Sequence, residues 1–136
     1  MSLRVLVADG NVDAADSVGH LLSLWGYDVQ IAYTAADALK AADYHDPDVT
    51  LLDIVLPEEG GVQVAERLRG RTHLIAVTGI GYEDYQRCYP SAGFSHYLQK
   101  PVNPELLHRL LRSLERIESA GTPLDAASHA DHSQRR

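Results

Sequence analysis

The sequence is poor in several residue types that mark particular classes of protein. It has one cysteine, Cys88, among 136 residues, so no internal disulfide can form and a reducing, cytoplasmic location is expected. No apolar run is long enough to cross a bilayer and no secretory signal is visible, so we expect no membrane insertion. Basic residues number 12 against 19 acidic ones, and the formal charge of −7 argues against nucleic acid as a partner. These absences leave a small acidic domain.

The chain alternates regularly between strand-like and helix-like segments. Segments typical of strands occupy residues 3–8, 28–32, 49–52, 74–77 and 94–98, and the second of them alternates between apolar and polar residues. Helical spacing or a helix-start signal follows each of them, over residues 15–25, 34–44, 62–68, 82–89 and 103–117. Such alternation predicts a parallel sheet with helices on both faces.

The polarity of the strands predicts their order in the sheet. The first, third and fourth strands are almost continuously apolar, as expected for strands covered on both faces. The second and fifth suit exposed edges because they carry polar residues, namely Asp28, Gln30, Ser95 and His96. This distribution favours a flavodoxin-like, doubly wound α/β fold with five parallel strands in the order 2-1-3-4-5.

Three features fit structural rather than functional interpretations. Residues 119–136 contain one large apolar side chain, Leu124, so we expect a disordered tail after a folded domain of residues 1–118. Cys88 is typical of a small core residue. The spacing of Tyr82, Tyr85 and Tyr89 predicts packing along one face of a helix.

Polar side chains stand where four of the predicted strands end: Asp9, Asp53, Thr78 and Lys100. In open α/β sheets, functional groups gather beyond the carboxyl ends of the strands, and these four strands are neighbours in the predicted order. Two carboxylates, a hydroxyl and an ammonium in one crevice suggest phosphoryl chemistry, because carboxylates bind Mg²⁺ while lysine and threonine hold phosphoryl oxygens. An aspartate can itself be the nucleophile.

Four runs of the sequence are distinctive: VLVADGNVDAADS, LLDIVLPEEGG, LIAVTGIG and AGFSHYLQKPV. In these runs, over about residues 3–118, the chain resembles the chemotaxis-regulator-like receiver domain of bacterial two-component response regulators. It is most similar to receivers that are attached to, or work with, hybrid sensor histidine kinases. The resemblance implies that the domain takes a phosphoryl group from a phosphohistidine on a sensor histidine kinase or a histidine phosphotransfer domain.

The resemblance implies a role for each residue at the strand ends. Asp53 would be the phosphoacceptor. Asp9, Asp53 and the backbone carbonyl of Val55 would bind Mg²⁺. Thr78 would be the switch hydroxyl that moves to the phosphoryl group, with Lys100 as its cationic partner.

The resemblance also predicts how the signal leaves the site. Tyr97 would be the aromatic switch on an output face formed by the fourth helix, the fifth strand and the fifth helix, a face that a homodimer could use. Pro101 is the expected cis-proline. Two apolar positions near the phosphoryl group, Val55 and Ile80, predict slow self-dephosphorylation.

The chain departs from the family pattern after the first strand. Gly10 stands where the family has a second metal-binding acid, and losing a carboxylate ligand is expected to lower metal affinity by at least about 10- to 100-fold. Asp13 and the pair Glu58–Glu59 are candidate substitutes, although Asp13 also fits a cap of the first helix and the pair a solvated loop. Gly60 is a second departure, since the family has Asp before the loop glycine.

There are three alternatives to a stand-alone phosphoacceptor domain, and the residues argue against the third. A pseudo-receiver would keep the fold and bind partners without phosphorylation, because of Gly10. The chain could also be the receiver segment of a larger hybrid histidine kinase. A small phosphatase with Asp53 as nucleophile is disfavoured, because Val55 stands where its general acid would be. We therefore expect a signalling domain rather than an enzyme.

Overall fold

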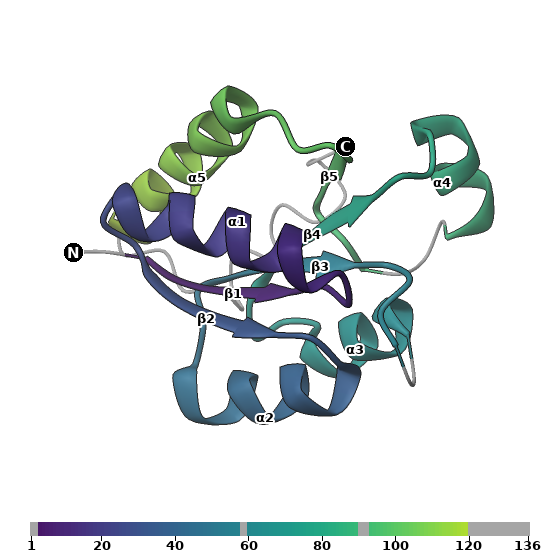
Figure 1. Ribbon diagram of the computed structural model, residues 1–136, viewed down its shortest axis with the longest axis horizontal. Coiled ribbons are helices and arrows are strands. Elements are labelled where there is room, and N and C mark those ends of the chain that lie inside the picture. Colours follow the sequence, from purple (N-terminus) through teal and green to yellow (C-terminus); the bar gives the residue numbers. More distant parts are fainter. Residues whose placement is uncertain (1–2, 58–59, 90–92, 120–136) are drawn as a thin grey trace.

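The strands and helices alternate along the chain as the sequence predicts. The computed structural model describes residues 3–57, 60–89 and 93–119. In chain order the elements are β1 (Arg4–Ala8), α1 (Val12–Leu24), β2 (Asp28–Ala32), α2 (Ala35–His45), β3 (Val49–Asp53), α3 (Gly61–Leu68), β4 (His73–Thr78), α4 (Tyr82–Cys88), β5 (His96–Gln99) and α5 (Pro104–Ser119). The strands are parallel and lie in the order β2-β1-β3-β4-β5 (Figure 1), which confirms the predicted topology.

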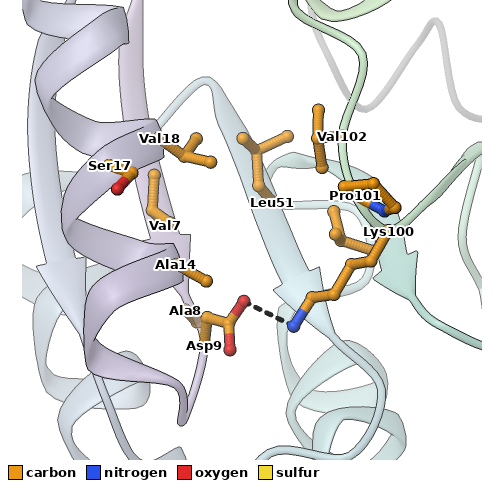
Figure 2. A pocket seen from close by; sticks show the side chains of 11 residues that line it. Val7, Ala8, Asp9, Ala14, Ser17, Val18, Leu51, Lys100, Pro101 and Val102 are labelled. Atoms are coloured by element: carbon orange, nitrogen blue, oxygen red, sulfur yellow. Dashed lines mark ion pairs between the residues drawn. The ribbon is translucent and has the colours of Figure 1, made fainter.

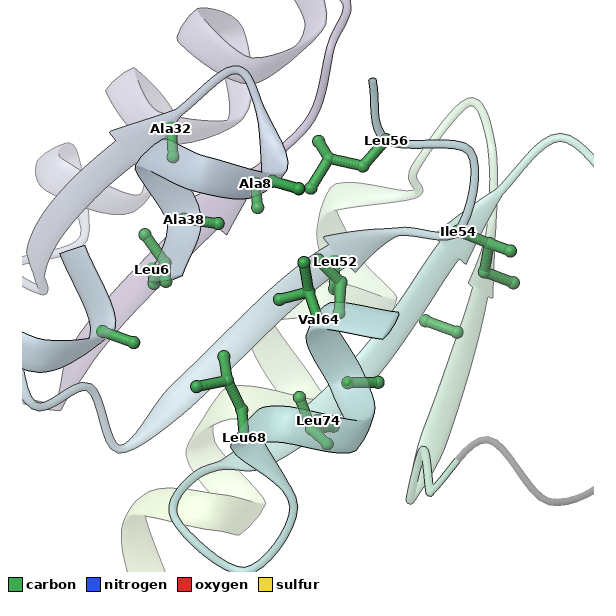
Figure 3. Packing of buried hydrophobic residues seen from close by; sticks show 14 of the residues in the cluster. Leu6, Ala8, Ala32, Ala38, Leu52, Ile54, Leu56, Val64, Leu68 and Leu74 are labelled. Carbon is green, nitrogen blue, oxygen red and sulfur yellow. The ribbon is translucent and has the colours of Figure 1, made fainter. Parts of the chain in front are cut away.

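The helices that cover the two faces of the sheet differ in the side chains that they bury. Helices α1 and α5 lie on one face, and α2 and α3 lie on the other (Figure 1). Four buried alanines of α2 let it approach the sheet closely, while Val64 and Leu68 of α3 pack on Leu52 and Leu74 (Figure 3). Leucines dominate the buried side of α5, and each fully buried leucine contributes about 1.5–3 kcal/mol to folding.

Side chains cap the amino-terminal ends of two helices at the positions that the sequence predicts. Thr34 Oγ1 accepts a hydrogen bond from the Asp37 N–H at 3.1 Å at the start of α2. Before α5, Asn103 Oδ1 accepts from the N–H groups of Glu105 at 2.9 Å and Leu106 at 3.2 Å. These bonds satisfy donors that have no partner within the helix.

Three local expectations are corrected. The fifth strand begins at His96 rather than at residue 94, because Phe94 turns into the core and its ring meets that of Tyr85 edge-on at 6.4 Å. Cys88 is exposed, so its prediction as a core residue is wrong. Asn11, not Asp13, caps α1: its side chain accepts from the Ala14 N–H at 3.0 Å.

The ends of the chain test the predicted organisation only in part. Helix α5 reaches Ser119, and residues 120–136 of the predicted tail lie outside the described residues. The boundary between domain and tail therefore stays a prediction. Among the residues that are described, no helix is long and apolar enough to span a membrane.

Candidate functional site

The parallel sheet brings the four predicted residues to one edge. Asp9 follows β1, Asp53 and Thr78 end the neighbouring strands β3 and β4, and Lys100 follows β5. In the register of β3 and β4, Asp53 lies opposite Val77, so Thr78 stands one step beyond it. Asp9, Asp53 and Thr78 are all buried, although polar side chains at strand ends are commonly exposed to water. The predicted crevice therefore exists.

A single ammonium group joins the two carboxylates. Lys100 Nζ lies 2.8 Å from Asp9 Oδ2 and 3.3 Å from Asp53 Oδ2. Figure 2 shows the lysine side chain reaching across from the segment after β5 to Asp9. Two negative groups share one positive group, so the cluster carries a net charge of −1 when all three are ionised.

Backbone N–H groups orient the other oxygen of each carboxylate. Asp9 Oδ1 accepts from the Asn11 N–H at 2.9 Å, and Asp53 Oδ1 accepts from the Val55 N–H at 3.0 Å. Such bonds to a residue two positions on are typical of aspartates in turns. They leave the Oδ2 atoms of both aspartates directed at the cation, and hence at the centre of the crevice.

The environment shifts the proton equilibria of this cluster. Burial raises the pKa of Asp53 above its ordinary value, and the nearby charge of Asp9 adds to the effect, against the opposing influence of the Val55 N–H and Lys100. Burial disfavours the ammonium of Lys100. The hydrogen bond to Asp9 and the charges of both aspartates nevertheless raise its pKa above the ordinary value. Asp53 therefore depends on the lysine cation to stay ionised in a partly buried site.

The donors at this edge are of the kind that Mg²⁺ takes. Magnesium is usually held by one or two carboxylates, with phosphate oxygens and water completing its shell, and Asp9 and Asp53 supply two. Within the described ranges, no group of three or more acidic, histidine or cysteine side chains could hold a metal ion. Asp13 is exposed on α1, and Glu58–Glu59 lies outside those ranges. The residues fit a magnesium site with few protein ligands.

The two glycine departures have local reasons. A Cβ atom at Gly10 would lie 2.5 Å from Cδ of Pro57, so the loop after β3 occupies the space of a side chain at position 10. Gly60 has φ 89° and ψ 160°, a conformation that is almost restricted to glycine. An aspartate at either position would therefore require the loop to move.

Tyr97 connects β5 to the loop that follows Thr78. Its hydroxyl donates a hydrogen bond to the backbone carbonyl of Ile80. Its ring lies 4.8 Å from that of Tyr85 and 5.1 Å from that of Tyr82, and burial raises the pKa of Tyr97. The predicted switch residue thus contacts both α4 and the β4–α4 loop. The Lys100–Pro101 peptide bond is cis, as expected.

A cleft beside the ion cluster was not predicted. It has a volume of about 490 Å³ and lies between α1 and the segment from Lys100 to Val102 (Figure 2). Ala14, Ser17 and Val18 line it from α1. No local pattern in the sequence signals it, because a cleft records side-chain volume that two distant segments lack.

Comparisons with known proteins agree with this geometry. The response regulator receiver domain family matches residues 5–112. The chain is 32% identical over 131 residues to the response regulator MprA of Mycobacterium tuberculosis, covering 93% of this chain and 55% of that protein. It is 33% identical over 121 residues to the regulatory protein VanR of Enterococcus faecium, covering 87% and 52%. A solved CheY-like receiver domain protein from Methanospirillum hungatei has a TM-score of 0.76 and 31% identity, covering 88% of this chain and 99% of that one.

These matches differ in how much of the other protein they cover. The chain spans about half the length of the curated relatives it matches and nearly all of the solved receiver. Family, fold and strand-end residues all lead to one assignment. The chain belongs to the response regulator receiver domain family of two-component signalling.

Proposed function

We propose that this domain accepts a phosphoryl group from a phosphohistidine onto Asp53. The observation that carries the proposal is the arrangement of Asp53. One carboxylate oxygen is fixed by the Val55 N–H, and the other faces Lys100 in a buried crevice. The partner would be a sensor histidine kinase or a histidine phosphotransfer domain. No nucleic acid is invoked, and the cytoplasm, where such partners present phosphohistidine, is the proposed location.

In this reaction an Asp53 carboxylate oxygen attacks phosphorus and the bond between phosphorus and the histidine nitrogen breaks. That nitrogen keeps the electron pair and takes a proton from water, so the histidine leaves as neutral imidazole. Lys100 then places its positive charge beside the phosphoryl oxygens. Asp9, Asp53 and the backbone carbonyl of Val55 would hold Mg²⁺, which neutralises phosphoryl charge when bound. Because Gly10 supplies no carboxylate, we expect weak binding of this ion.

Phosphorylation of Asp53 would change the output face through the side chains of Thr78 and Tyr97. Thr78 Oγ1 accepts from the Ile80 N–H at 3.1 Å, and Tyr97 bonds to the carbonyl of the same residue. A phosphoryl group that draws the Thr78 hydroxyl toward itself would disturb both bonds and bias the conformation of α4, β5 and α5. That face is also where we propose that two copies associate.

The proposed phospho-form is long-lived. Val55, which is 68% exposed, and half-buried Ile80 offer no polar group that could orient an attacking water. We expect a half-life of minutes or longer. A half-life of seconds with Mg²⁺ present would contradict this part of the proposal.

Intact-mass spectrometry tests the proposal. The full chain is incubated with acetyl phosphate, with and without Mg²⁺, beside two variants. Wild type and Asp48→Asn should each gain one phosphoryl mass in a Mg²⁺-dependent manner, whereas Asp53→Asn should gain none. Asp48 is the matched control because it lies before β3, at the other end of the strand. If wild type gains no mass even at high Mg²⁺, the domain is a pseudo-receiver that acts by binding partners.

A further inference from the structure

The cleft between α1 and the segment after β5 has the size of a small-molecule site. Its volume of about 490 Å³ falls within the range of about 300–1,000 Å³ that is typical of ligand pockets. Most of its wall is apolar, and many of the side chains are small: Val7, Ala14, Val18, Val77, Pro101 and Val102. The cleft is therefore wide because its walls are built from short side chains.

The inner end of the cleft is charged. Lys100 and Asp9 line it and form an ion pair at 2.8 Å, with 27% and 9% of their side chains exposed (Figure 2). Asp53 lies behind this pair, 3.3 Å from the same ammonium. The two charges that line the cleft cancel, and Asp53 behind them gives the cluster a net charge of −1 when all three groups are ionised, within a chain whose formal charge is −7.

Asp9 has hydrogen-bonding capacity to spare. Each of its oxygens accepts one bond, from the Asn11 N–H and from Lys100 Nζ, although a carboxylate offers about four acceptor sites. A cationic donor entering the cleft would find an acceptor and a favourable field. An anion would meet Asp9 directly and would also be repelled by Asp53 behind Lys100.

We propose that this cleft binds a small apolar molecule that carries a primary amine. Its ring or chain would lie against the valines of the wall, and its ammonium would bond to Asp9 beside Lys100. The site shares Asp9 and Lys100 with the proposed phosphoryl chemistry, so an amine and Mg²⁺ would compete for Asp9, and the titrations are made on the unmodified chain without Mg²⁺.

Three probes of nearly equal shape separate charge from apolar contact. 2-Phenylethylamine, 2-phenylethanol and 3-phenylpropionate are titrated at low salt into the ¹⁵N-labelled full chain, and amide chemical shifts are followed. The amine should bind with a dissociation constant of about 1 mM, as expected for so small a ligand. The alcohol should bind about tenfold more weakly, and the acid more weakly still. Shifts should centre on residues 7–9, 14–18 and 100–102.

Substitutions locate the site. Val102→Phe and, independently, Ala14→Leu place extra volume in the cleft and should each abolish the shifts caused by the amine. Val12→Phe is the matched control, because Val12 lies on the same helix, is 48% exposed and does not line the cleft. Asp9→Asn should lower the affinity for the amine to that of the alcohol and leave the alcohol unchanged.

Several results would overturn the inference. They are the absence of a saturable shift with the amine, binding of the acid as tight as that of the amine, and full binding by folded Val102→Phe and Ala14→Leu. Amine-induced shifts confined to the exposed acidic residues of α1 would mean that only surface charge is being titrated. Protein unfolding in the variants is monitored by the dispersion of the same spectra.

Discussion

The two ends of the sheet handle polar groups in opposite ways. At the amino end, two buried side-chain pairs form, while the exposed Arg4 guanidinium lies 3.8 Å from both Asp46 and Asp48. Thr50 and Thr72 share a hydrogen bond of 3.1 Å in the core, and the buried His73 ring lies 3.2 Å from Glu118 of α5. At the carboxyl end, one lysine serves two aspartates, and the cluster keeps a net negative charge. In the two buried pairs at the amino end, each polar side chain has a partner. The cluster at the carboxyl end attracts a further cation.

The polar pairs at the amino end contribute to stability, whereas the charged cluster at the carboxyl end is suited to binding. A buried polar group is tolerated when its hydrogen bonds are satisfied, so the Thr50–Thr72 and His73–Glu118 pairs need no further ligand. The carboxyl end combines buried carboxylates with a cleft and an unbalanced charge, which disfavours the ionised folded state and favours binding. Substitutions that alter the balance at each end should therefore have different consequences.

The largest expected effect comes from removing the shared cation. Lys100→Met keeps the length of the side chain but leaves Asp9 and Asp53 facing each other without a positive charge. We expect a loss of about 2 kcal/mol in the free energy of unfolding at pH 7, less than for a fully buried pair because Lys100 is partly exposed. Urea denaturation followed by circular dichroism measures it.

Two further variants test whether the loss in Lys100→Met comes from the unbalanced charge of the aspartates. Arg71→Met removes an exposed cation paired with Asp43 at 3.0 Å and should cost no more than about 0.5 kcal/mol. Adding Asp53→Asn to Lys100→Met should restore most of the stability, because one of the two repelling charges is gone. Equal losses in the two methionine variants, or no rescue, would show that charge balance does not govern this end.

At the amino end, stability should depend on whether each buried hydroxyl keeps its hydrogen-bond partner. Thr50→Val is nearly isosteric and leaves the Thr72 hydroxyl buried without the partner that it has in the native structure. The expected loss is about 1.5 kcal/mol in the free energy of unfolding. The double variant Thr50→Val/Thr72→Val should be close to wild type, since both polar groups are then removed. If the two single losses simply add in the double variant, the hydrogen bond contributes no coupling.

Gly10→Asp tests whether the carboxyl end can take a third carboxylate. We expect Mg²⁺ affinity, measured by calorimetric titration, to rise about tenfold or more. We also expect a loss of about 1 kcal/mol in stability, because a Cβ atom at this position would meet Pro57 at 2.5 Å. Gly10→Ala introduces the same contact without the carboxylate, so it should lose stability and gain no affinity. If Mg²⁺ affinity rose in both variants, the cause would be movement of the loop and not binding of the ion by the new carboxylate.

The comparison of the two ends also shows what the sequence could predict. The fold followed from apolar periodicity and strand polarity, and the meeting of Asp9, Asp53, Thr78 and Lys100 followed from parallel topology alone. Contacts between distant segments could not be predicted. The approach of Pro57 to Gly10 is an example, because no local pattern records how closely two loops pack.

Two wrong predictions, for the start of β5 and for the burial of Cys88, also arise from contacts between distant segments. Apolar character predicted that the last strand would begin at residue 94, yet the Phe94 ring packs against Tyr85, a tertiary contact that overrides local preference. Cys88 was expected inside because cysteine is usually buried, but it ends a short helix of which Tyr85 is the buried residue. The roles of the site residues stay predictions that phosphorylation experiments must test.

The smallest effect, and the one of opposite sign, is expected for Asp53→Asn. Burial raises the pKa of Asp53 in the folded protein above its ordinary value of 3.8, so the folded state binds the proton more tightly than the unfolded chain. Stability should therefore fall as the pH rises from about 3.8 through the raised folded pKa, and above that pKa the charge opposes folding. Asparagine carries no charge and still offers an oxygen to the Val55 N–H.

We expect Asp53→Asn to be more stable than wild type at pH 7, by less than the losses predicted above, and equally stable below the ordinary pKa of the carboxyl group. Urea denaturation of both proteins across this pH range measures the difference. Asp48→Asn is the control at the amino end, where the Asp48 carboxylate accepts from the Arg4 N–H at 2.9 Å and lies near its guanidinium, so its neutralisation should bring no gain. A less stable Asp53→Asn at pH 7 would mean that Lys100 more than offsets the burial of the charge, and that the carboxyl end is as well balanced as the amino end.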